Sequence, residues 1–305
     1  MTASGRATVD QTEGSGDATA PTARLLLGKP LAAELRARVA GDVVAIRAAR
    51  GRPPTLAIVF VGSDAPSAVY LERIIHGCRT IGAGVRTVAL PADAEADSLR
   101  RAIGQLNDDP EVDGIIVQMP LPPGIPLRAV IDTIDPLKDV DGLHPANAGL
   151  LALGYDGFLP ATAQAAVEIL KRSGYRLAGL DATVVGRSNV VGRPTALLLL
   201  REHCTVTICH SRTRDLAART RTADVLIVAA GHPALVTGAM IKPGALVVDV
   251  GINVTPAGIV GDVEFATAST VAAAITPVPG GVGPLTGAIL LDHLVTAAWR
   301  QQGAT

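Results

Sequence analysis

Aromatic side chains are scarce in this sequence, where they make up 2% of the 305 residues, whereas 48% of the residues are hydrophobic. The core must therefore be built from Val, Leu, Ile and Ala. That composition suits buried parallel strands that are covered by helices. The length leaves room for two domains of ordinary size.

Net charge is also nearly absent, because 27 Lys and Arg residues face 28 Asp and Glu residues. No basic block stands out, so nucleic acid is not expected as a partner. The three cysteines, Cys78, Cys204 and Cys209, have neither metal-ligand nor disulfide spacing. We interpret them as reduced core residues of a cytoplasmic protein and predict no metal site. No apolar run reaches transmembrane length, so no membrane partner is expected.

Residues 1–24 are rich in Gly, Ala, Thr, Ser and Asp and lack the charged-then-apolar pattern of a signal peptide. This composition predicts a disordered tail without a function of its own. After it, the chain alternates between two kinds of segment. The predicted helices are 29–49, 67–81, 94–106 and 127–134, and the predicted strands are 55–61, 85–90 and 114–117. This order predicts a parallel sheet, whose ligands bind where strands end, as at Gln118.

The stretch VVGRSNVVGRP (184–194) lies between a β-branched run and an apolar run, which predicts a strand, a turn and a helix. Gly186 and Gly192 would relieve crowding where the backbone turns close to a ligand. The first N–H groups of the helix would then face a pyrophosphate. The spacing G-x-S-x-x-x-G departs from the usual G-x-G-x-x-G, so the pattern alone also fits an ordinary turn.

A second predicted strand, 206–209, is followed by His-Ser-Arg-Thr without the acidic residue that binds the ribose of NAD. Ser211 and Arg212 offer a hydroxyl and a guanidinium instead. These groups suit a 2′-phosphate, so NADP is favoured over NAD. Arg187 is either a second phosphate partner or a solvated side chain.

The run KDVDG (138–142) holds two carboxylates. Either both are solvated loop charges, or Asp141, held in a turn by Gly142, points into a cleft. There it would accept two N–H groups from a planar, amidine-like edge. Further on, the pattern predicts a helix at 214–222, strands at 224–230 and 245–250, a glycine-rich loop at 276–284 and a closing helix at 284–301. We assign the apolar face of that closing helix, which includes His293, to the core.

Seven segments together resemble the methylenetetrahydrofolate dehydrogenase/cyclohydrolase family, in the family's order over residues 25–300. They are VGSDAPSAVY, DGIIVQMPLP, KDVDGLHP, VVGRSNVVGRP, ADVLIVAAG, VVDVGIN and TPVPGGVGPLT. The resemblance implies two α/β domains with a cleft between them, and a homodimer. Residues 25–155 would form a parallel-sheet folate domain on which the closing helix 284–302 packs. Residues 156–283 would form a Rossmann-like NADP domain. The family oxidises 5,10-methylenetetrahydrofolate to the methenyl form and hydrolyses that to 10-formyltetrahydrofolate.

The resemblance also assigns site residues. Tyr70 matches the tyrosine that stacks on the folate, Gln118 the glutamine beside the catalytic lysine, and Asp141 the aspartate that grips the pterin. The implied substrate-binding residues are Tyr70, Gln118, Pro120, Asp141, Gly280, Gly281 and Pro284. The implied cofactor-binding residues are Gly186, Arg187, Ser188, Val191, Gly192, Ser211, Arg212, Gly231, Gly251 and Ile252.

Two departures from the family stand out. The family reads Y-V-x-x-K, whereas this chain places Ile74 at the lysine position, and P-C-T-P-x-G becomes PATAQA at 160–165. Hydride transfer needs only a positioned C–H bond and nicotinamide. Hydrolysis needs a group that moves protons, which a buried lysine supplies and isoleucine cannot. We therefore predict an NADP-dependent dehydrogenase whose cyclohydrolase activity is weak or lost.

The neighbours of Ile74 in the sequence do not replace the proton-transfer function of the family's lysine. Arg73 stays protonated and cannot act as a base. His76 lies about 200° around the helix from Ile74 and faces away. Two alternatives stay open: a paralogue that acts on another pterin-like or cyclic-amine substrate, and a non-catalytic protein that binds folate and NADP.

Overall fold

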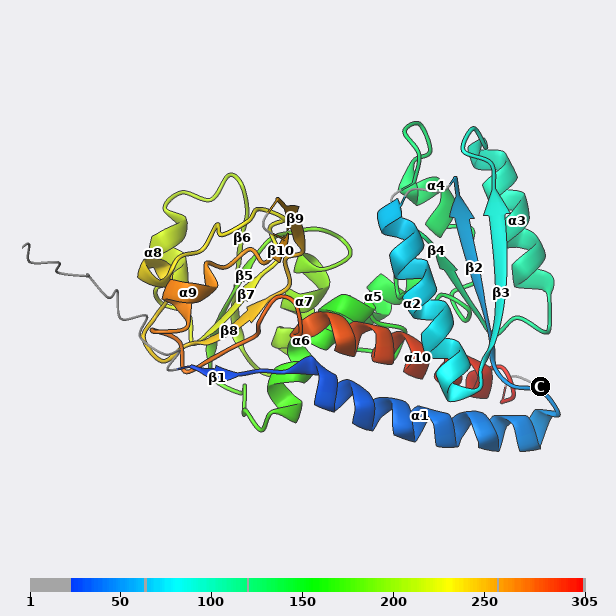
Figure 1. Ribbon diagram of the computed structural model, residues 1–305, viewed down its shortest axis with the longest axis horizontal. Coiled ribbons are helices and arrows are strands. Elements are labelled where there is room, and N and C mark those ends of the chain that lie inside the picture. The colour runs from blue at the N-terminus through cyan, green and yellow to red at the C-terminus, as the bar shows by residue number, and fades with distance from the viewer. Residues whose placement is uncertain (1–22, 63–64, 120, 257, 304–305) are drawn as a thin grey trace, which may run out of the picture.

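The computed structural model describes residues 23–62, 65–119, 121–256 and 258–303. Two parallel sheets form the two halves of the molecule (Figure 1). The long helices α1 (Gly28–Arg50) and α10 (Val282–Arg300) pack against each other, and α10 extends from one half towards the other. The predicted α/β class with two sheets is therefore confirmed.

The first half is built on three strands in the order β3-β2-β4. The central strand is apolar and mostly buried, as expected of a strand covered by helices on both faces. The strands are β2 (Thr55–Val61), β3 (Gly84–Leu90) and β4 (Gly114–Val117). The helices are α2 (Ala65–Ile81), α3 (Ala96–Asp108), α4 (Leu127–Ile131) and α5 (Pro145–Leu153).

The second half is a six-stranded parallel sheet in the order β1-β11-β8-β7-β5-β6. Its strands are β1 (Arg24–Leu25), β5 (Asp181–Val185), β6 (Thr205–Cys209), β7 (Val225–Val228), β8 (Leu246–Asp249) and β11 (Ala274–Ile275). Its helical segments are α6 (Ala161–Arg172), α7 (Gly192–Arg201), α8 (Leu216–Thr220), η1 (Gly238–Met240) and α9 (Phe265–Ala268). A separate antiparallel hairpin joins β9 (Asn253–Thr255) to β10 (Gly258–Val260).

The boundary of the predicted tail is wrong by at least two residues, because Ala23 is already buried and its N–H donates to the Ser269 carbonyl at 2.9 Å. The assignment of residue 25 to the first half is wrong too. Arg24 pairs with Ala274 and Leu25 with Ile275, so both belong to the sheet of the second half. A two-residue strand has no periodicity for a sequence pattern to reveal. Residues 1–22 of the expected tail lie outside the described residues.

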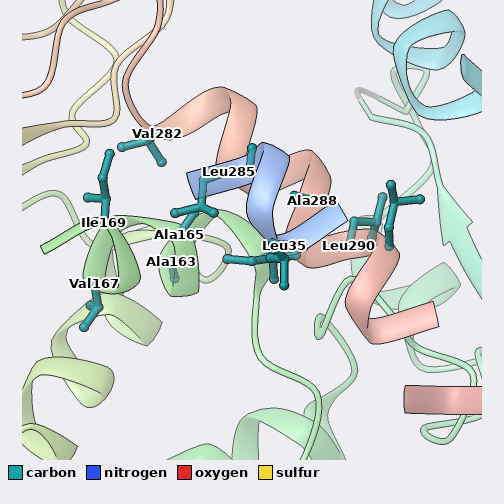
Figure 2. Packing of buried hydrophobic residues seen from close by; sticks show 14 of the residues in the cluster. Leu35, Ala163, Ala165, Val167, Ile169, Val282, Leu285, Ala288 and Leu290 are labelled. Carbon is teal, nitrogen blue, oxygen red and sulfur yellow. The ribbon is translucent and has the colours of Figure 1, made fainter. Parts of the chain in front are cut away.

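The largest buried cluster is centred on α1, α6 and α10. Leu35 of α1, Ala163 and Ala165 of α6, and Leu285 and Ala288 of α10 converge in it (Figure 2). The alanines let helix backbones approach closely, which explains how a core with few aromatic rings packs densely. Apolar residues at helical spacing supply the α1 stripe, as the sequence predicted.

α10 is long and apolar enough to cross a membrane by length and composition, with 61% of the relevant stretch buried inside the protein. This differs from the expectation that no apolar run reaches that length. The helix packs against α1, α2 and α6. An extended apolar surface is what a helix needs when other helices surround it, so α10 has the character of a core helix.

A buried ionic link closes the base of the first half. The Asp113 carboxylate is fully buried and contacts the guanidinium groups of Arg50 and Arg52, each at 2.6 Å. The Gln301 amide, just after α10, donates to the carbonyl of Asp113 at 2.8 Å. The ends of α1 and α10 are thus both fixed to the start of β4.

Candidate active site

Gln118 directly follows β4, at the carboxyl edge of the first sheet. The order of strands reverses between β2 and β4, the position where ligands bind in open α/β sheets. The Gln118 backbone N–H donates to the carbonyl of Val59 at 2.8 Å, which fixes the residue to β2. Its side-chain amide is half-buried and donates to the carbonyl of Met119 at 2.9 Å.

The turn 138–142 runs alongside β4, because the Ile115 N–H donates to the Lys138 carbonyl at 2.7 Å. Lys138 is buried, and its ammonium donates to the carbonyls of Leu106, Asn107 and Asp109 at the end of α3. Burial lowers the pKa of this ammonium. Its three acceptors make Lys138 a structural group.

Asp139 is structural as well. Its buried carboxylate accepts hydrogen bonds from the N–H groups of Leu143 and His144, at 3.1 and 2.8 Å, and from the Asn147 side chain at 2.8 Å. Burial raises its pKa, and these hydrogen bonds oppose the rise. The interpretation of both carboxylates as solvated loop charges is therefore wrong, because Asp139 is 1% exposed.

Asp141 is the free carboxylate of this turn. It is half-buried, and no hydrogen-bond donor or cation among the described residues contributes to its ionisation. Burial raises its pKa to about 7, and repulsion from Asp139 adds to the rise. A half-buried carboxylate without a partner is a group that a ligand with paired N–H donors can satisfy.

Gly142 gives this turn its shape. Its φ of +69° lies in the left-handed region that favours glycine. A Cβ atom at this position would lie 2.3 Å from the backbone carbon of Leu159. The turn with Asp141 therefore packs directly on the chain that leads into α6, the first helix of the second half.

Ile74, at the position where the family carries lysine, is buried on α2 with 5% exposure. It belongs to the same apolar cluster as Leu285 and Ala288 of α10. Its neighbours Arg73 and His76 are exposed, so the structure does not bring them to the same place as Ile74. Tyr70 lies in α2, but its side chain is outside the described part of the chain, as is the whole of Pro120.

Gly280 and Gly281 lie where α1 and α10 begin. The Gly28 N–H donates to the Gly280 carbonyl at 2.9 Å, and a Cβ on Gly28 would lie 1.9 Å from the Gly281 oxygen. The absence of side chains lets the two helix starts meet. Pro284 lies half-buried in the first turn of α10.

The carboxyl edge of the second sheet carries the predicted cofactor residues. The strand order reverses between β5 and β7, again the position expected for a ligand. A Cβ on Gly186 would lie 2.2 Å from the Ala229 oxygen, and one on Gly192 would lie 2.2 Å from the Gly186 oxygen. Both glycines are therefore required by packing of the turn against itself and against β7.

Ser188 caps the start of α7. Its hydroxyl oxygen accepts from the N–H groups of Val191 and Gly192 at 3.1 and 3.3 Å, and its carbonyl accepts from the Arg193 N–H at 3.1 Å. The N–H groups of Val191 and Gly192 are thus held by the Ser188 hydroxyl, and their role in binding a pyrophosphate stays a prediction. Arg187 is exposed beside this turn.

The turn after β6 lies next to the turn after β5, because the Gly186 N–H donates to the Cys209 carbonyl at 2.8 Å. Ser211 and Arg212 are both exposed in it, and the Arg212 backbone N–H donates to the His210 ring at 3.1 Å. The structure thus brings Arg187, Ser188, Ser211 and Arg212 to one edge of the sheet.

Two buried carboxylates that the sequence analysis missed hold the backbone just after β7 and β8, at the carboxyl edge of the second sheet. Asp262 accepts from the N–H groups of Ala230 and Gly231 at 2.6 and 2.8 Å. Asp249 accepts from the Gly251 N–H at 2.9 Å, and burial raises its pKa to about 6. The N–H groups of both predicted cofactor glycines are therefore held by these side chains. Ile252, the next residue, is 69% exposed.

Three polar residues near the Asp141 turn were also missed. They are Asn147 and His293, which contact Asp139 and Val140 of the turn, and Gln164, which contacts His293. His293 was predicted as a core residue, and it is buried, but both of its ring nitrogens have polar partners. A polar residue on an otherwise apolar helical face was the signal in the sequence.

Two parallel sheets with reversals of strand order, of which one has a glycine turn after β5, place this chain among two-part α/β proteins with a candidate dinucleotide site. Comparison with known families is more specific. Residues 26–141 match the catalytic domain of the tetrahydrofolate dehydrogenase/cyclohydrolase family, and residues 160–302 match its NAD(P)-binding domain. The chain therefore belongs to this family.

Individual relatives are similar to this chain over nearly its whole length. Bifunctional protein FolD 3 of Rhizorhabdus wittichii is 53% identical over 289 residues, which cover 92% of this chain and 94% of that protein. The crystal structure of the bifunctional enzyme FolD from Campylobacter jejuni is 41% identical, with a TM-score of 0.89 over 91% of this chain and 99% of that one. The Trypanosoma brucei enzyme, complexed with NADP cofactor and inhibitor, is 36% identical, with a TM-score of 0.88 over 92% and 98%.

These similarities confirm the family, the two-sheet fold and the prediction of an enzyme that uses a nicotinamide dinucleotide. The roles of the individual site residues, and the fate of the hydrolytic reaction, stay predictions.

Proposed function

We propose that this chain is an NADP-dependent 5,10-methylenetetrahydrofolate dehydrogenase whose cyclohydrolase activity is weak or lost. The observation that carries the proposal is the contrast between two positions that the family resemblance assigns to one site. Asp141 is half-buried and free to bind a ligand, whereas the position of the family's lysine holds the buried side chain of Ile74.

For hydride transfer, the chain has to hold the substrate and exclude water. Asp141 accepts two N–H groups of the pterin edge in a bidentate pair, which orients the ring system. Gln118 lines the same strand edge. When NADP is bound, its nicotinamide accepts the hydride, and the lone pair of a folate nitrogen drives the hydride out. No side chain has to transfer a proton in this step.

The side chains at the carboxyl edge of the second sheet suit NADP. Arg187, Ser211 and Arg212 are exposed together where the adenosine end of a dinucleotide lies in this type of sheet. A guanidinium pairs well with a phosphate, and the turn 210–213 holds no carboxylate that would repel it. The Trypanosoma brucei relative, solved with NADP, supports the same choice.

For hydrolysis, a group must take a proton from water and later protonate a ring nitrogen. General acid–base catalysis of this kind is typically worth about 10²–10⁴-fold. Ile74 has no ionisable group, and the exposed positions of Arg73 and His76 supply no replacement beside it. We therefore expect the chain to retain the dehydrogenase reaction of the family and to have lost most of the cyclohydrolase reaction.

We also propose a homodimer in the cytoplasm, with a folate-binding domain that spans 26–155 after the correction at Leu25, a cofactor-binding domain at 156–283 and the segment 284–302 packed back on the first. Packing of α10 against α1 and α2 supports the return of the last segment. The free, buried cysteines Cys78, Cys204 and Cys209 support a reducing compartment.

A second candidate is dehydrogenation of a different pterin-like or cyclic-amine substrate. The apolar Ile74, together with Ala161, Ala163 and Ala165 in α6, favours a cleft of altered shape. A third candidate is a folate- and NADP-binding protein without catalysis. The presence of Asp141 and of the glycine turn after β5 argues against a protein without catalysis, because hydride transfer does not need the missing lysine.

Two parallel rate measurements test the proposal: NADPH formation from 5,10-methylenetetrahydrofolate and NADP, and hydrolysis of 5,10-methenyltetrahydrofolate. We expect the first at a rate typical of enzymes and the second near the uncatalysed rate. Methenyl hydrolysis well above the uncatalysed rate would refute the loss of cyclohydrolase activity. NADP binding without NADPH formation would move the search to another substrate.

A further inference from the structure

His293 lies buried in the middle of α10 and contacts polar groups from two other segments. Its Nδ1 atom is 2.8 Å from the carbonyl oxygen of Val140, the residue immediately before Asp141. Its Nε2 atom is 2.8 Å from the side-chain oxygen Oε1 of Gln164 in α6. One imidazole therefore connects α10, the turn with the free carboxylate and the first helix of the second half.

Both atoms that face the ring, the Val140 carbonyl oxygen and Gln164 Oε1, are acceptors. The carbonyl of Val140 can only accept, so Nδ1 carries the hydrogen. Burial lowers the pKa of His293, which favours the neutral ring. A neutral ring with its hydrogen on Nδ1 is satisfied at Nε2 when the Gln164 amide is turned so that its NH₂ group, in place of Oε1, faces the ring. With this arrangement, neither the carbonyl nor the ring is left without a partner in the apolar interior.

The same turn is held from its other side by a second set of contacts. The Asn147 side chain donates to Asp139 at 2.8 Å and accepts from the Phe158 N–H at 3.2 Å. The ring of Phe158 in turn lies 5.5 Å from the ring of His293, centre to centre. The contacts form a closed circuit around the backbone of residues 139 and 140, next to Asp141.

This circuit also ties the turn to the chain that leads into the second half. Phe158 lies just before α6 and Gln164 within it, and Gly142 packs on the backbone of Leu159 and Pro160. A displacement of α6 relative to the first sheet would therefore move the partners of the turn. The backbone on both sides of Asp141 is held by the same residues that join the two halves.

We propose that His293 and Gln164 are positioning residues for Asp141, which set the direction of its carboxylate and link it to the placement of the cofactor half. The inference rests on the proposed function in that Asp141 binds the substrate. The polar side-chain contacts of these residues run to Val140 and to each other, so their removal should act on substrate binding through Asp141 and leave cofactor binding unchanged.

The first experiment compares His293→Leu with His293→Asn in steady-state kinetics. Leucine fills the space without a donor, whereas the asparagine amide can place an N–H close to the former Nδ1 position. We expect His293→Leu to raise KM for 5,10-methylenetetrahydrofolate roughly tenfold, the effect of about 1.4 kcal/mol of misaligned binding. KM for NADP should stay within about twofold, and His293→Asn should restore most of the substrate KM.

Leu290→Ala is the matched control, because Leu290 is equally buried on the same helix but makes no polar contact. It should lower the melting temperature without changing the ratio of the two KM values. Equal changes in both KM values for His293→Leu, or no rescue by His293→Asn, would overturn the positioning role. Gln164→Leu should reproduce the selective rise in substrate KM to a smaller extent.

A second readout does not depend on the substrate. Backbone amide hydrogen exchange of the peptide that covers 139–144 should be faster in His293→Leu than in wild type, and unchanged in Leu290→Ala and His293→Asn. Unchanged exchange in His293→Leu would contradict the inference. If wild type does not oxidise the folate, the proposed function fails, while hydrogen exchange still decides whether His293 holds the turn.

Discussion

Asp139 and Asp141 lie two positions apart in one turn, and of the two carboxylates only that of Asp139 contributes to the fold. The carboxylate of Asp139 is held by two backbone N–H groups and the Asn147 amide, whereas the Asp141 carboxylate has no donor among the described residues. Asp139 therefore makes the turn, and Asp141 is left for a ligand. This division of roles leads to the first prediction.

Removal of the Asp141 charge should change the pH dependence of stability. The folded-state pKa is about 7, above the ordinary 3.8, so the protonated acid favours the folded state. This contribution is complete below about pH 4 and is lost as the pH rises through about 7. Relative to Asp141→Asn, wild type should lose thermal stability between pH 5 and pH 8.

Melting temperatures of both proteins across that range measure the difference. Asp249, whose pKa is raised to about 6, is present in both and cancels. The same ionisation should improve substrate binding in wild type as the pH rises past 7, since the carboxylate is the better partner for N–H donors. A melting-temperature difference that stays constant with pH would contradict the raised pKa.

Ile74→Lys should add hydrolysis of the methenyl compound to the dehydrogenase. The new amine would stand where the family carries its lysine, in surroundings that exclude water, which lower its pKa towards the range useful for proton transfer. It should also lower the melting temperature, because position 74 is 5% exposed in wild type.

The matched control is Ile75→Lys, the next residue on α2, which is 8% exposed. It carries the same cost of burying an amine but points about 100° away around the helix. We expect Ile75→Lys to lose stability without any gain in hydrolysis. Equal gains in both variants, or none in Ile74→Lys while it remains folded, would show that position 74 does not control the reaction.

Gly142→Ala should weaken both the fold and substrate binding. Its φ of +69° costs a residue with a side chain about 1–2 kcal/mol, and the added Cβ would also meet the backbone of Leu159 at 2.3 Å. Gly154→Ala is the control, because its φ of +76° is similar while no atom lies within 4 Å of the added Cβ.

Chemical denaturation and substrate KM give the two readouts. The free energy of unfolding should fall further in Gly142→Ala than in Gly154→Ala, and only the former should raise substrate KM. If the two variants behave alike, the close packing of the turn on the chain before α6 is not what fixes Asp141.

Arg212→Ala should reduce the preference for NADP. A hydrogen bond to a charged partner contributes about 1.5–3 kcal/mol, so KM for NADP should rise at least tenfold. KM for NAD, which has no 2′-phosphate, should stay nearly constant. Arg214→Ala, a change at another exposed arginine two positions on, is the control and should alter neither value. A loss of NAD binding equal to that of NADP would disprove a role for Arg212 in phosphate recognition.

The sequence predicted several regular elements in which one period dominates, but it did not predict the helices α5 and α6. The apolar run of β2 and the helical stripe of α1 needed no tertiary context, because burial on both faces or on one face sets the pattern. The strands β1 and β11, with two residues each, and the hairpin β9–β10 were missed, because so few residues carry no periodicity.

The candidate site was predictable to a different extent. Motif spacing identified Asp141 and the glycine turn, because both depend on local backbone geometry. The contacts of Asp262 with Gly231 and of His293 with Val140 join residues more than thirty positions apart, so no local pattern contains them. The capping of α7 by Ser188 was missed because a serine hydroxyl can satisfy the same N–H groups as a phosphate.

The packing of α10 on α1 has a consequence for the order in which the protein is made. About 230 residues separate the two helices along the chain, so a ribosome completes α10 on the order of tens of seconds after α1. During that time the apolar stripe of α1 has no α10 to cover it. In the second sheet, β1 likewise has no strand to pair with until β11 has been synthesised. The half that is synthesised first can therefore complete its core only when synthesis of the second half is nearly finished.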